Sequence, residues 1–230
     1  MRRKTTAVRI GNVVLSSEEP VLVQSMLNTS TREVDACVEQ AIRIIEAGGR
    51  LVRITAPGVK EAEMLGEIHR RLRERGYTTP ISADIHFVAE AASVAARYVE
   101  KVRINPGNFA DKRATFKKLT YTDEEYAAEL EILRQKFTEF LEVCRQYGTA
   151  VRIGTNHGSL SDRIMSRYGD TPAGMVEATM EYLRVCQACD FKDVVISLKS
   201  SDCRTMVDAV RLLVEKMEAE GMCYPFHLGV

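Results

Sequence analysis

The tripeptide Val-Arg-Ile recurs in three segments that have the composition of buried strands: Val52-Arg53-Ile54, Val102-Arg103-Ile104 and Val151-Arg152-Ile153. Side chains alternate between the two faces of a strand, so valine and isoleucine share one face in each segment and arginine occupies the other. A buried arginine destabilises a protein unless a counter-charge lies close to it. Three arginines at the same place in successive strands therefore indicate an anion held where those strands converge.

Strand and helix patterns alternate along the chain. Residues 7–15 predict a hairpin that turns at Gly11-Asn12. Helix starts are indicated by capping boxes at Ser30 and Thr122 and by Pro172 at a first helical position. Seven further strands are expected, over residues 21–25, 51–55, 81–85, 101–105, 150–154, 193–198 and 224–229. This alternation predicts a parallel sheet with right-handed crossover connections.

Such a sheet is either doubly wound or part of an eight-stranded barrel, and the strand interiors distinguish the two. In a barrel, one alternate set of side chains faces the outer helices and the other set faces the axis. The side chains that this rule assigns to the axis are Gln24, Arg53, Thr55, Ser82, Asp84, His86, Arg103, Asn105, Arg152, Ser197, Lys199 and His227. One polar lumen collected from seven strands favours a TIM (β/α)8-type barrel, preceded by the short hairpin.

The barrel is expected to be incomplete, because the sequence stops at the end of the seventh strand. An open seam would leave unpaired backbone groups on the strands that border it. We therefore expect residues 1–230 to form a single, truncated barrel domain of a longer protein.

Composition narrows the possible partners and the compartment. The 32 basic and 32 acidic residues cancel, so we expect no general attraction to nucleic acid or to anionic membranes. No apolar run is long enough to cross a membrane, and the charged start is followed by no signal-peptide core. Six cysteines scattered through a large domain are typical of reduced thiols. Together these features predict a cytoplasmic protein.

The candidate binding site lies at the carboxyl ends of the strands, where barrel enzymes carry their chemistry. Arg53, Arg103, Arg152 and Lys199 meet there, and guanidinium groups match the geometry of phosphate oxygens. Four cations exceed what one phosphate needs, so a diphosphate is the expected ligand. The alternative is a ligand-free ion network, in which Asp84 would have to balance all four cations.

Two kinds of group supplement the cations. Backbone N–H groups at Gly107, Gly158 and Ser159 are candidates for further contacts to phosphate oxygens. Asp84 and His86 share one strand face and are the candidates for proton transfer near the ligand. The roles of His157 and His227 are left open by the sequence.

The pair Cys186-x-x-Cys189 superficially indicates a metal site. It lies within an expected helix, and its nearest companions in the sequence, Cys203 and Cys223, form no second close pair. Packing of that helix against the barrel is the preferred interpretation, and we expect no metal site in this chain.

Several motifs in order carry a resemblance to a known family: Gln24-Ser25-Met26, Val52-Arg53, Ala83-Asp84-Ile85-His86, Arg103-Ile104-Asn105-Pro106-Gly107-Asn108, Arg152-Ile153-Gly154-x-Asn156-x-Gly158-Ser159-Leu160 and His227-Leu228-Gly229. With these motifs the chain resembles the N-terminal barrel of 4-hydroxy-3-methylbut-2-enyl diphosphate synthases. The stretch Asn108-Phe109-Ala110-Asp111, the long helical connection after it and the stretch from Gly154 to Met165 are similar to the larger, three-domain form of plant plastids and some bacteria. The absence of a transit peptide favours a bacterial cytoplasm.

The resemblance implies a specific reaction. The family opens the ring of 2-C-methyl-D-erythritol 2,4-cyclodiphosphate by two-electron reduction, in the methylerythritol phosphate route to isoprenoids. A 4Fe–4S cluster in a C-terminal domain and a ferredoxin or flavodoxin type of electron donor belong to that activity. By the same resemblance, the diphosphate would be held by Arg53, Arg103, Arg152 and Lys199, assisted by Asn105 and Asn156. Asp84 and His86 would line the carbon skeleton of the substrate.

The chain also departs from the family pattern. It lacks the eighth strand, the family's Thr-Glu-Ala-Gly stretch, the insert domain and the domain with the cluster ligands. We therefore expect residues 1–230 not to catalyse alone. Two alternatives stay open at this point: a pterin-binding barrel similar to dihydropteroate synthase, and a phosphate-binding barrel without catalysis.

Overall fold

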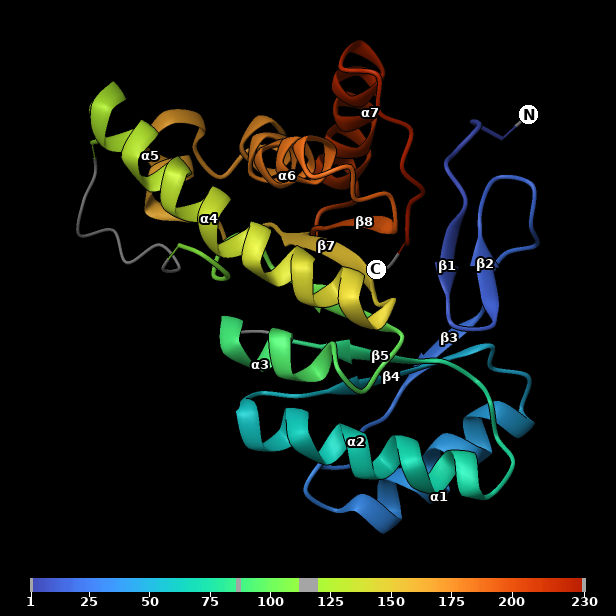
Figure 1. The fold of residues 1–230 in the computed structure, drawn as a ribbon. Helices are drawn as coiled ribbons and strands as arrows, with labels where there is room; N and C mark the ends of the chain where they lie inside the picture. Colours follow the sequence, from blue (N-terminus) through green and yellow to red (C-terminus); the bar gives the residue numbers. More distant parts are fainter. Residues whose placement is uncertain (1, 86–87, 112–119, 229–230) are drawn as a thin grey trace.

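A computed structural model describes residues 2–85, 88–111 and 120–228. Its main sheet has six parallel strands, which follow one another in chain order. They are β3 (Gln24–Met26), β4 (Leu51–Thr55), β5 (Ile81–Asp84), β6 (Lys101–Ile104), β7 (Ala150–Asn156) and β8 (Val194–Lys199). The sheet forms a half-barrel with helices along its outer side (Figure 1). The prediction of an incomplete TIM-type barrel behind a hairpin is confirmed.

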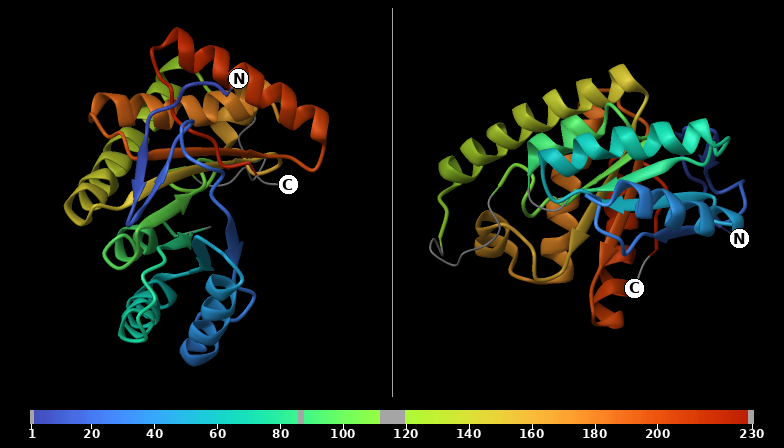
Figure 2. Two further views of the ribbon diagram at one scale, coloured as in Figure 1. Left: turned by 90° about the vertical axis from the view of Figure 1, so that its right-hand side faces the viewer. Right: turned by 90° about the horizontal axis from the view of Figure 1, so that it is seen from below.

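Seven helices are present in the described ranges. They are α1 (Val34–Glu46), α2 (Val59–Glu74), α3 (Ala89–Ala95), α4 (Asp123–Tyr147), α5 (Asp162–Tyr168), α6 (Pro172–Ala188) and α7 (Cys203–Ala219). Figure 2 shows the helices around the periphery and the strands on the inside. The helix start predicted at Thr122 is confirmed, because its hydroxyl accepts from the Glu125 amide in a capping box.

Three local predictions were wrong. The Ser30 side chain caps no helix: α1 starts after Glu33, whose amide donates to the Ser30 carbonyl instead. Helix α5 lies between the strand expected over 150–154 and the helix start expected at Pro172, where no helix was predicted. The strand expected over 224–229 is represented, among the described residues, by a single parallel bridge between Ile196 and Phe226. Its backbone pairs with β8 at this one point, and no second strand pairs with it within the described residues.

The outer face of the sheet is the hydrophobic core. The valines and isoleucines of the three Val-Arg-Ile segments are at most 1% exposed, and they pack with the helices in one cluster. Burying each of these side chains contributes about 1.5–3 kcal/mol. This burial turns every arginine of the three segments toward the concave side of the half-barrel.

The N-terminal hairpin packs against the start of the sheet. Strands β1 (Val8–Ile10) and β2 (Val13–Leu15) pair antiparallel around Gly11, whose φ of +57° suits glycine. Val8 and Ile10 pack with Leu51 and Ala150, the first residues of β4 and β7. The hairpin contains a fourth Val-Arg-Ile tripeptide, Val8-Arg9-Ile10, whose arginine is exposed. In the described part of the chain, no helix is long and apolar enough to span a lipid bilayer.

Candidate functional site

The concave face of the half-barrel carries Arg53, Arg103 and Arg152, three of the four predicted cations. Asp84, Arg103 and Arg152 are paired positions on β5, β6 and β7, so the three side chains stand in one row across the sheet. All three are at most 4% exposed. Arg53, on β4, stands next to this row and is partly exposed.

Asp84 holds two of the arginines. Its Oδ2 accepts from Arg53 Nη2, and its Oδ1 accepts from Arg103 Nη1 at 3.4 Å. Part of the ligand-free ion network considered from the sequence is therefore real. It leaves Arg152 outside, because no contact joins Asp84 to Arg152 at hydrogen-bond distance within the described residues.

Gly154 makes room for Arg103. The Arg103 Nη2 donates to the Gly154 carbonyl oxygen at 2.7 Å. A Cβ at position 154 would lie 2.5 Å from Arg103 Nε, closer than atoms pack. Glycine at this point of β7 is therefore what lets the buried guanidinium lie flat against the neighbouring strand.

The three arginines retain hydrogen-bond donors that nothing in the described residues accepts. Four buried nitrogens have no partner there: Arg53 Nε, Arg103 Nε, Arg152 Nε and Arg152 Nη1. Buried polar groups in native proteins are nearly always paired, so unpaired donors of this kind indicate a missing acceptor. Burial lowers the pKa of Arg152 below the usual arginine value, and the positive charges of Arg53 and Arg103 lower it further. The site has an excess of positive charge.

Lys101 belongs to the same face, and the sequence analysis missed it. It is 1% exposed, and its Nζ donates to Gln24 Oε1 across the concave side at 3.1 Å. The signal was available: Lys101 precedes Arg103 by two residues on one strand, so the two side chains share a face.

A cavity of about 780 Å³ lies along the open side of the half-barrel. Residues from β3 line one side, and residues 225–228 line the other. Arg53, Lys101 and His227 also line it. Burial lowers the pKa of His227 to about 3, and the neighbouring positive charge of Arg152 lowers it too. His227 is therefore neutral at physiological pH and adds no charge to the site.

The loops after β6 and β7 are in close backbone contact. A Cβ on Gly107 would lie 1.5 Å from the Ser159 carbonyl oxygen, so only glycine fits there. Asn105, which is 4% exposed, links the two loops: its Nδ2 donates to Ser159 Oγ at 3.1 Å, and its Oδ1 accepts from the Gly107 amide at 3.2 Å. The predicted side chain is at the mouth of the half-barrel, where it orders both loops.

The backbone amides proposed as phosphate donors already have acceptors. The Gly107 amide donates to Asn105 Oδ1, the Gly158 amide to Asp170 Oδ1 and the Ser159 amide to the Asn156 carbonyl. That prediction was wrong for this conformation, because short polar side chains and turns in the loops satisfy the amides locally.

The remaining predicted residues lie at the ends of β7 and β8. Asn156 and Lys199 are paired positions at the mouth; Lys199 is exposed and Asn156 half-buried. His157 Nε2 contacts the Asp170 carbonyl at 3.2 Å, which favours a role in the loop over contact with a ligand. His86 lies outside the described residues.

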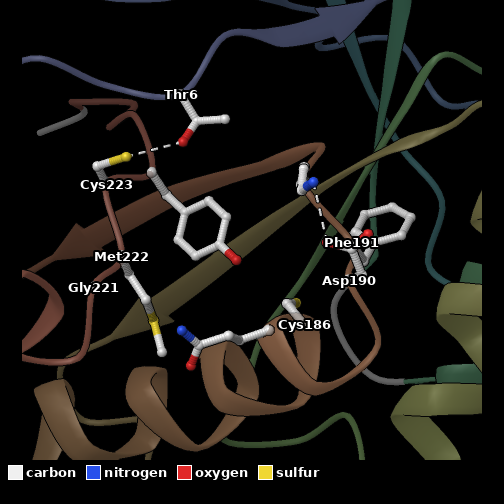
Figure 3. A pocket seen from close by; sticks show the side chains of 10 residues that line it. Thr6, Cys186, Asp190, Phe191, Gly221, Met222 and Cys223 are labelled. Atoms are coloured by element: carbon white, nitrogen blue, oxygen red, sulfur yellow. Dashed lines mark hydrogen bonds and ion pairs between the residues drawn. The ribbon is translucent and has the colours of Figure 1, made fainter.

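Cysteines form a separate region around a second, smaller cavity (Figure 3). This cavity of about 300 Å³ is lined by Cys186 and Cys223, and Cys223 Sγ lies 3.1 Å from Thr6 Oγ1. Cys186 is fully buried in the core of α6, in agreement with a packing role. The described residues contain no group of three or more His, Cys, Asp or Glu side chains that could hold a metal ion.

These features define the class of protein: an α/β half-barrel of the TIM-barrel type with buried basic side chains on its concave face. Residues 5–230 match the GcpE TIM-barrel domain, and the chain belongs to that family.

Similar proteins are found across bacteria and plants. The chain is 60% identical over 229 residues to a 4-hydroxy-3-methylbut-2-en-1-yl diphosphate synthase (flavodoxin) of Parabacteroides distasonis. It is 48% identical over 230 residues to the chloroplastic, ferredoxin-dependent synthase of Arabidopsis thaliana. Both matches cover 100% of this chain but only 38% and 31% of those proteins. The chain therefore spans little more than a third of the length of its curated relatives.

Solved structures agree on the fold alone. A truncated 3-deoxy-D-arabino-heptulosonate 7-phosphate synthase of Thermotoga maritima matches with a TM-score of 0.57 and 13% identity, over 98% of this chain and 69% of that chain. A 7,8-dihydropteroate synthase of Vibrio fischeri matches with a TM-score of 0.57 and 14% identity, over 98% and 78% of the two chains. The pterin-binding alternative thus shares the fold, while the family match and the 60% identity do not favour it.

Proposed function

We propose that residues 1–230 are the substrate-binding domain of a 4-hydroxy-3-methylbut-2-en-1-yl diphosphate synthase. The ligand of the concave face would be 2-C-methyl-D-erythritol 2,4-cyclodiphosphate. The observation that carries the proposal is the set of four buried guanidinium nitrogens without partners on Arg53, Arg103 and Arg152. A diphosphate presents several oxygens to such donors, and charged hydrogen bonds of this kind are about twice as strong as neutral ones.

Different residues would contact different parts of the ligand. Arg103 and Arg152 would hold the diphosphate against the floor of the site, with Arg53 on one side. Asn156 and Lys199 at the mouth would contact its outer oxygens, and Asn105 would keep the mouth loops in place. Asp84 and His86 would line the carbon skeleton and move protons, because a hydroxyl must leave as water when the ring opens.

The redox half of the activity belongs to the longer protein. The names of the relatives specify flavodoxin or ferredoxin, and we infer the same kind of electron donor here. A 4Fe–4S cluster would supply single electrons in that protein, but it needs several converging thiolates. Cys37, Cys144 and Cys186 are buried in the core, and no such group forms in the described part. The residues of this chain do not fit a cluster, so no step of the reaction is assigned to one here. A cytoplasmic location is part of the proposal.

Calorimetric titration of the chain with the cyclodiphosphate tests the site. Arg152→Met should fold and weaken binding by about 10- to 100-fold, which corresponds to losing about 1.5–3 kcal/mol from a charged hydrogen bond. Arg152 is the informative position, because it pairs with no carboxylate within the described residues and its removal breaks no ion pair. Arg43→Met, on the exposed face of α1, is the matched control and should bind as the wild type does. Equal affinity of the wild type and Arg152→Met would refute the assignment.

A second titration separates the proposal from the non-catalytic alternative. A general phosphate-binding barrel would take inorganic diphosphate as well as the cyclodiphosphate. We expect the cyclodiphosphate to bind more tightly, because only it offers a carbon skeleton with hydroxyl groups to the site as well as phosphate oxygens. We also expect no reductive turnover by residues 1–230 with a chemical reductant. Turnover by residues 1–230 alone would contradict the proposal that the redox half of the activity belongs to the longer protein.

A further inference from the structure

Lys101 is the least exposed basic side chain of the concave face. It is the first residue of β6 and is 1% exposed, and its single hydrogen bond within the described part goes to the neutral amide of Gln24. Charged and titratable groups face this region from every neighbouring strand: Arg53 on β4, Asp84 on β5, Arg103 on β6, Arg152 on β7 and His227 after β8. A buried ammonium in such surroundings has lost its hydration without gaining a carboxylate.

The charges on this face do not balance when the site is empty. Three arginines and Lys101 stand against Asp84, and Asp84 is already engaged by Arg53 and Arg103. A cluster with this excess of positive charge releases a proton from its strongest acid, the cation whose conjugate base is weakest. Lysine is that group, because guanidinium is the stronger base and loses less when it is desolvated. Burial lowers the pKa of Lys101 well below the usual lysine value, and the charges of Arg152 and Arg53 lower it further.

We propose that Lys101 is a neutral amine in the free chain and becomes an ammonium when the cyclic diphosphate binds, so that ligand binding takes up one proton. The balance is simple: amine, dianionic ligand and one solvent proton give ammonium and bound dianion. Two negative charges among the arginines replace repulsion of the ammonium by attraction. This inference rests on the proposed function, and it makes Lys101 a positioning residue that adjusts the charge of the site.

The proposal has a defined signature in pH. Both phosphates of the cyclic ligand carry a single, strongly acidic hydroxyl, so the ligand itself does not titrate near neutrality. His227 is neutral there as well. If binding takes up one proton, the bound state holds more protons than the free state. The association constant then falls as pH rises, by up to about tenfold per pH unit in the window between the two lysine pKa values.

Calorimetry measures the proton directly. Titrations of the wild-type chain with the cyclodiphosphate at about pH 8, in buffers that differ in ionisation enthalpy, should show uptake of about one proton. Lys101→Met keeps the length of the side chain without the charge; it should take up none, bind less tightly at about pH 6 and show a flat pH profile. Lys192→Met is the matched control: Lys192 is exposed and pairs with Asp190, away from the concave face. It should behave as the wild type.

The protonation state of Lys101 in the ligand-free chain can be measured independently, so failure of this inference is distinguishable from failure of the proposed function. In a chain labelled at lysine Cε, one carbon resonance absent from Lys101→Met should report a neutral amine at about pH 8 and an ammonium in the complex. A charged Lys101 in the free chain overturns the inference, whatever binds. Binding without proton uptake overturns the inference and leaves the proposed function standing. Absence of binding by the wild type at every pH overturns both.

Discussion

Replacing Gly154 with alanine tests whether the arginine row is held in place by backbone geometry. The new Cβ would lie 2.5 Å from Arg103 Nε and 3.2 Å from Ser197 Oγ. The φ angle of Gly154 is not positive, so alanine fits the backbone and the whole effect falls on the side chains. Arg103 is 2% exposed and cannot swing into solvent. It must therefore shift from Asp84 and from the Gly154 carbonyl.

Two magnitudes follow from this displacement. Overpacking of a close-packed site costs about 1–3 kcal/mol of unfolding free energy. A guanidinium moved off its ligand loses about 1.5–3 kcal/mol of a charged hydrogen bond, or about 10- to 100-fold in affinity for the cyclodiphosphate. Both losses should appear together, because one movement causes them.

Denaturant unfolding and calorimetric titration of the same samples measure the two effects. Gly66→Ala is a matched control, since its Cβ would lie 2.8 Å from Tyr98 Cδ1, between α2 and the turn after α3 and far from the cations. It should alter stability and leave affinity unchanged. If Gly154→Ala binds the cyclodiphosphate as tightly as the wild type, Arg103 does not hold the ligand from its observed position.

Three further changes have expected outcomes. Gly107→Ala places a Cβ on the backbone of the loop after β7, so thermal unfolding should show a loss of about 3 kcal/mol or more; an unchanged Tm would mean that the two loops separate freely. His227 has a lowered pKa, so the folded state binds fewer protons than the unfolded state between about pH 6.5 and 3. The free energy of unfolding therefore decreases as the pH is lowered through this range, by up to about 1.4 kcal/mol per pH unit. His227→Gln should lessen this acid sensitivity in denaturant titrations, and an unaltered pH profile would contradict the shift. Arg163 bridges Asp111 and Glu181 with its side chain 2% exposed, so Arg163→Met should cost about 3–5 kcal/mol in urea unfolding, and a loss below about 1 kcal/mol would show that the carboxylates find other partners.

Most of the fold could be predicted because it depends on patterns with short periods. Valine and isoleucine on one face of three strands, with polar residues on the other, determine which side meets the helices. The errors fall where partners are distant in sequence. The strand expected over 224–229 forms a single bridge among its described residues, because a strand needs neighbours on the sheet as well as a suitable composition. Helix α5 was not predicted, because a seven-residue helix is too short to show a clear helical periodicity in the sequence. Its Arg163 and Ile164 are buried against other elements, which the sequence does not show.

In the candidate site, too, the sequence predicted some residues correctly and missed or misjudged others. Arg53, Arg103 and Arg152 were found because each sits in a motif that places it on the concave face. Lys101 was missed although the strand period puts it on the same face. The backbone amides were misjudged because their acceptors, such as Asp170, come from other turns of the loops. Local pattern identifies which face a side chain takes, but not what it meets there.

The four Val-Arg-Ile tripeptides show what the sequence alone determines and what depends on the tertiary structure. The sequence by itself determined that each would form a strand and that its arginine would oppose its aliphatic neighbours. Only the tertiary structure decided that Arg9 is exposed and that Asp84 pairs with Arg53 and Arg103. The physical reason is that strand formation depends on local alternation, whereas charge excess depends on how many strands the fold brings to one face. A carboxylate shared by two arginines, and a third arginine left without one, are properties of the assembled half-barrel.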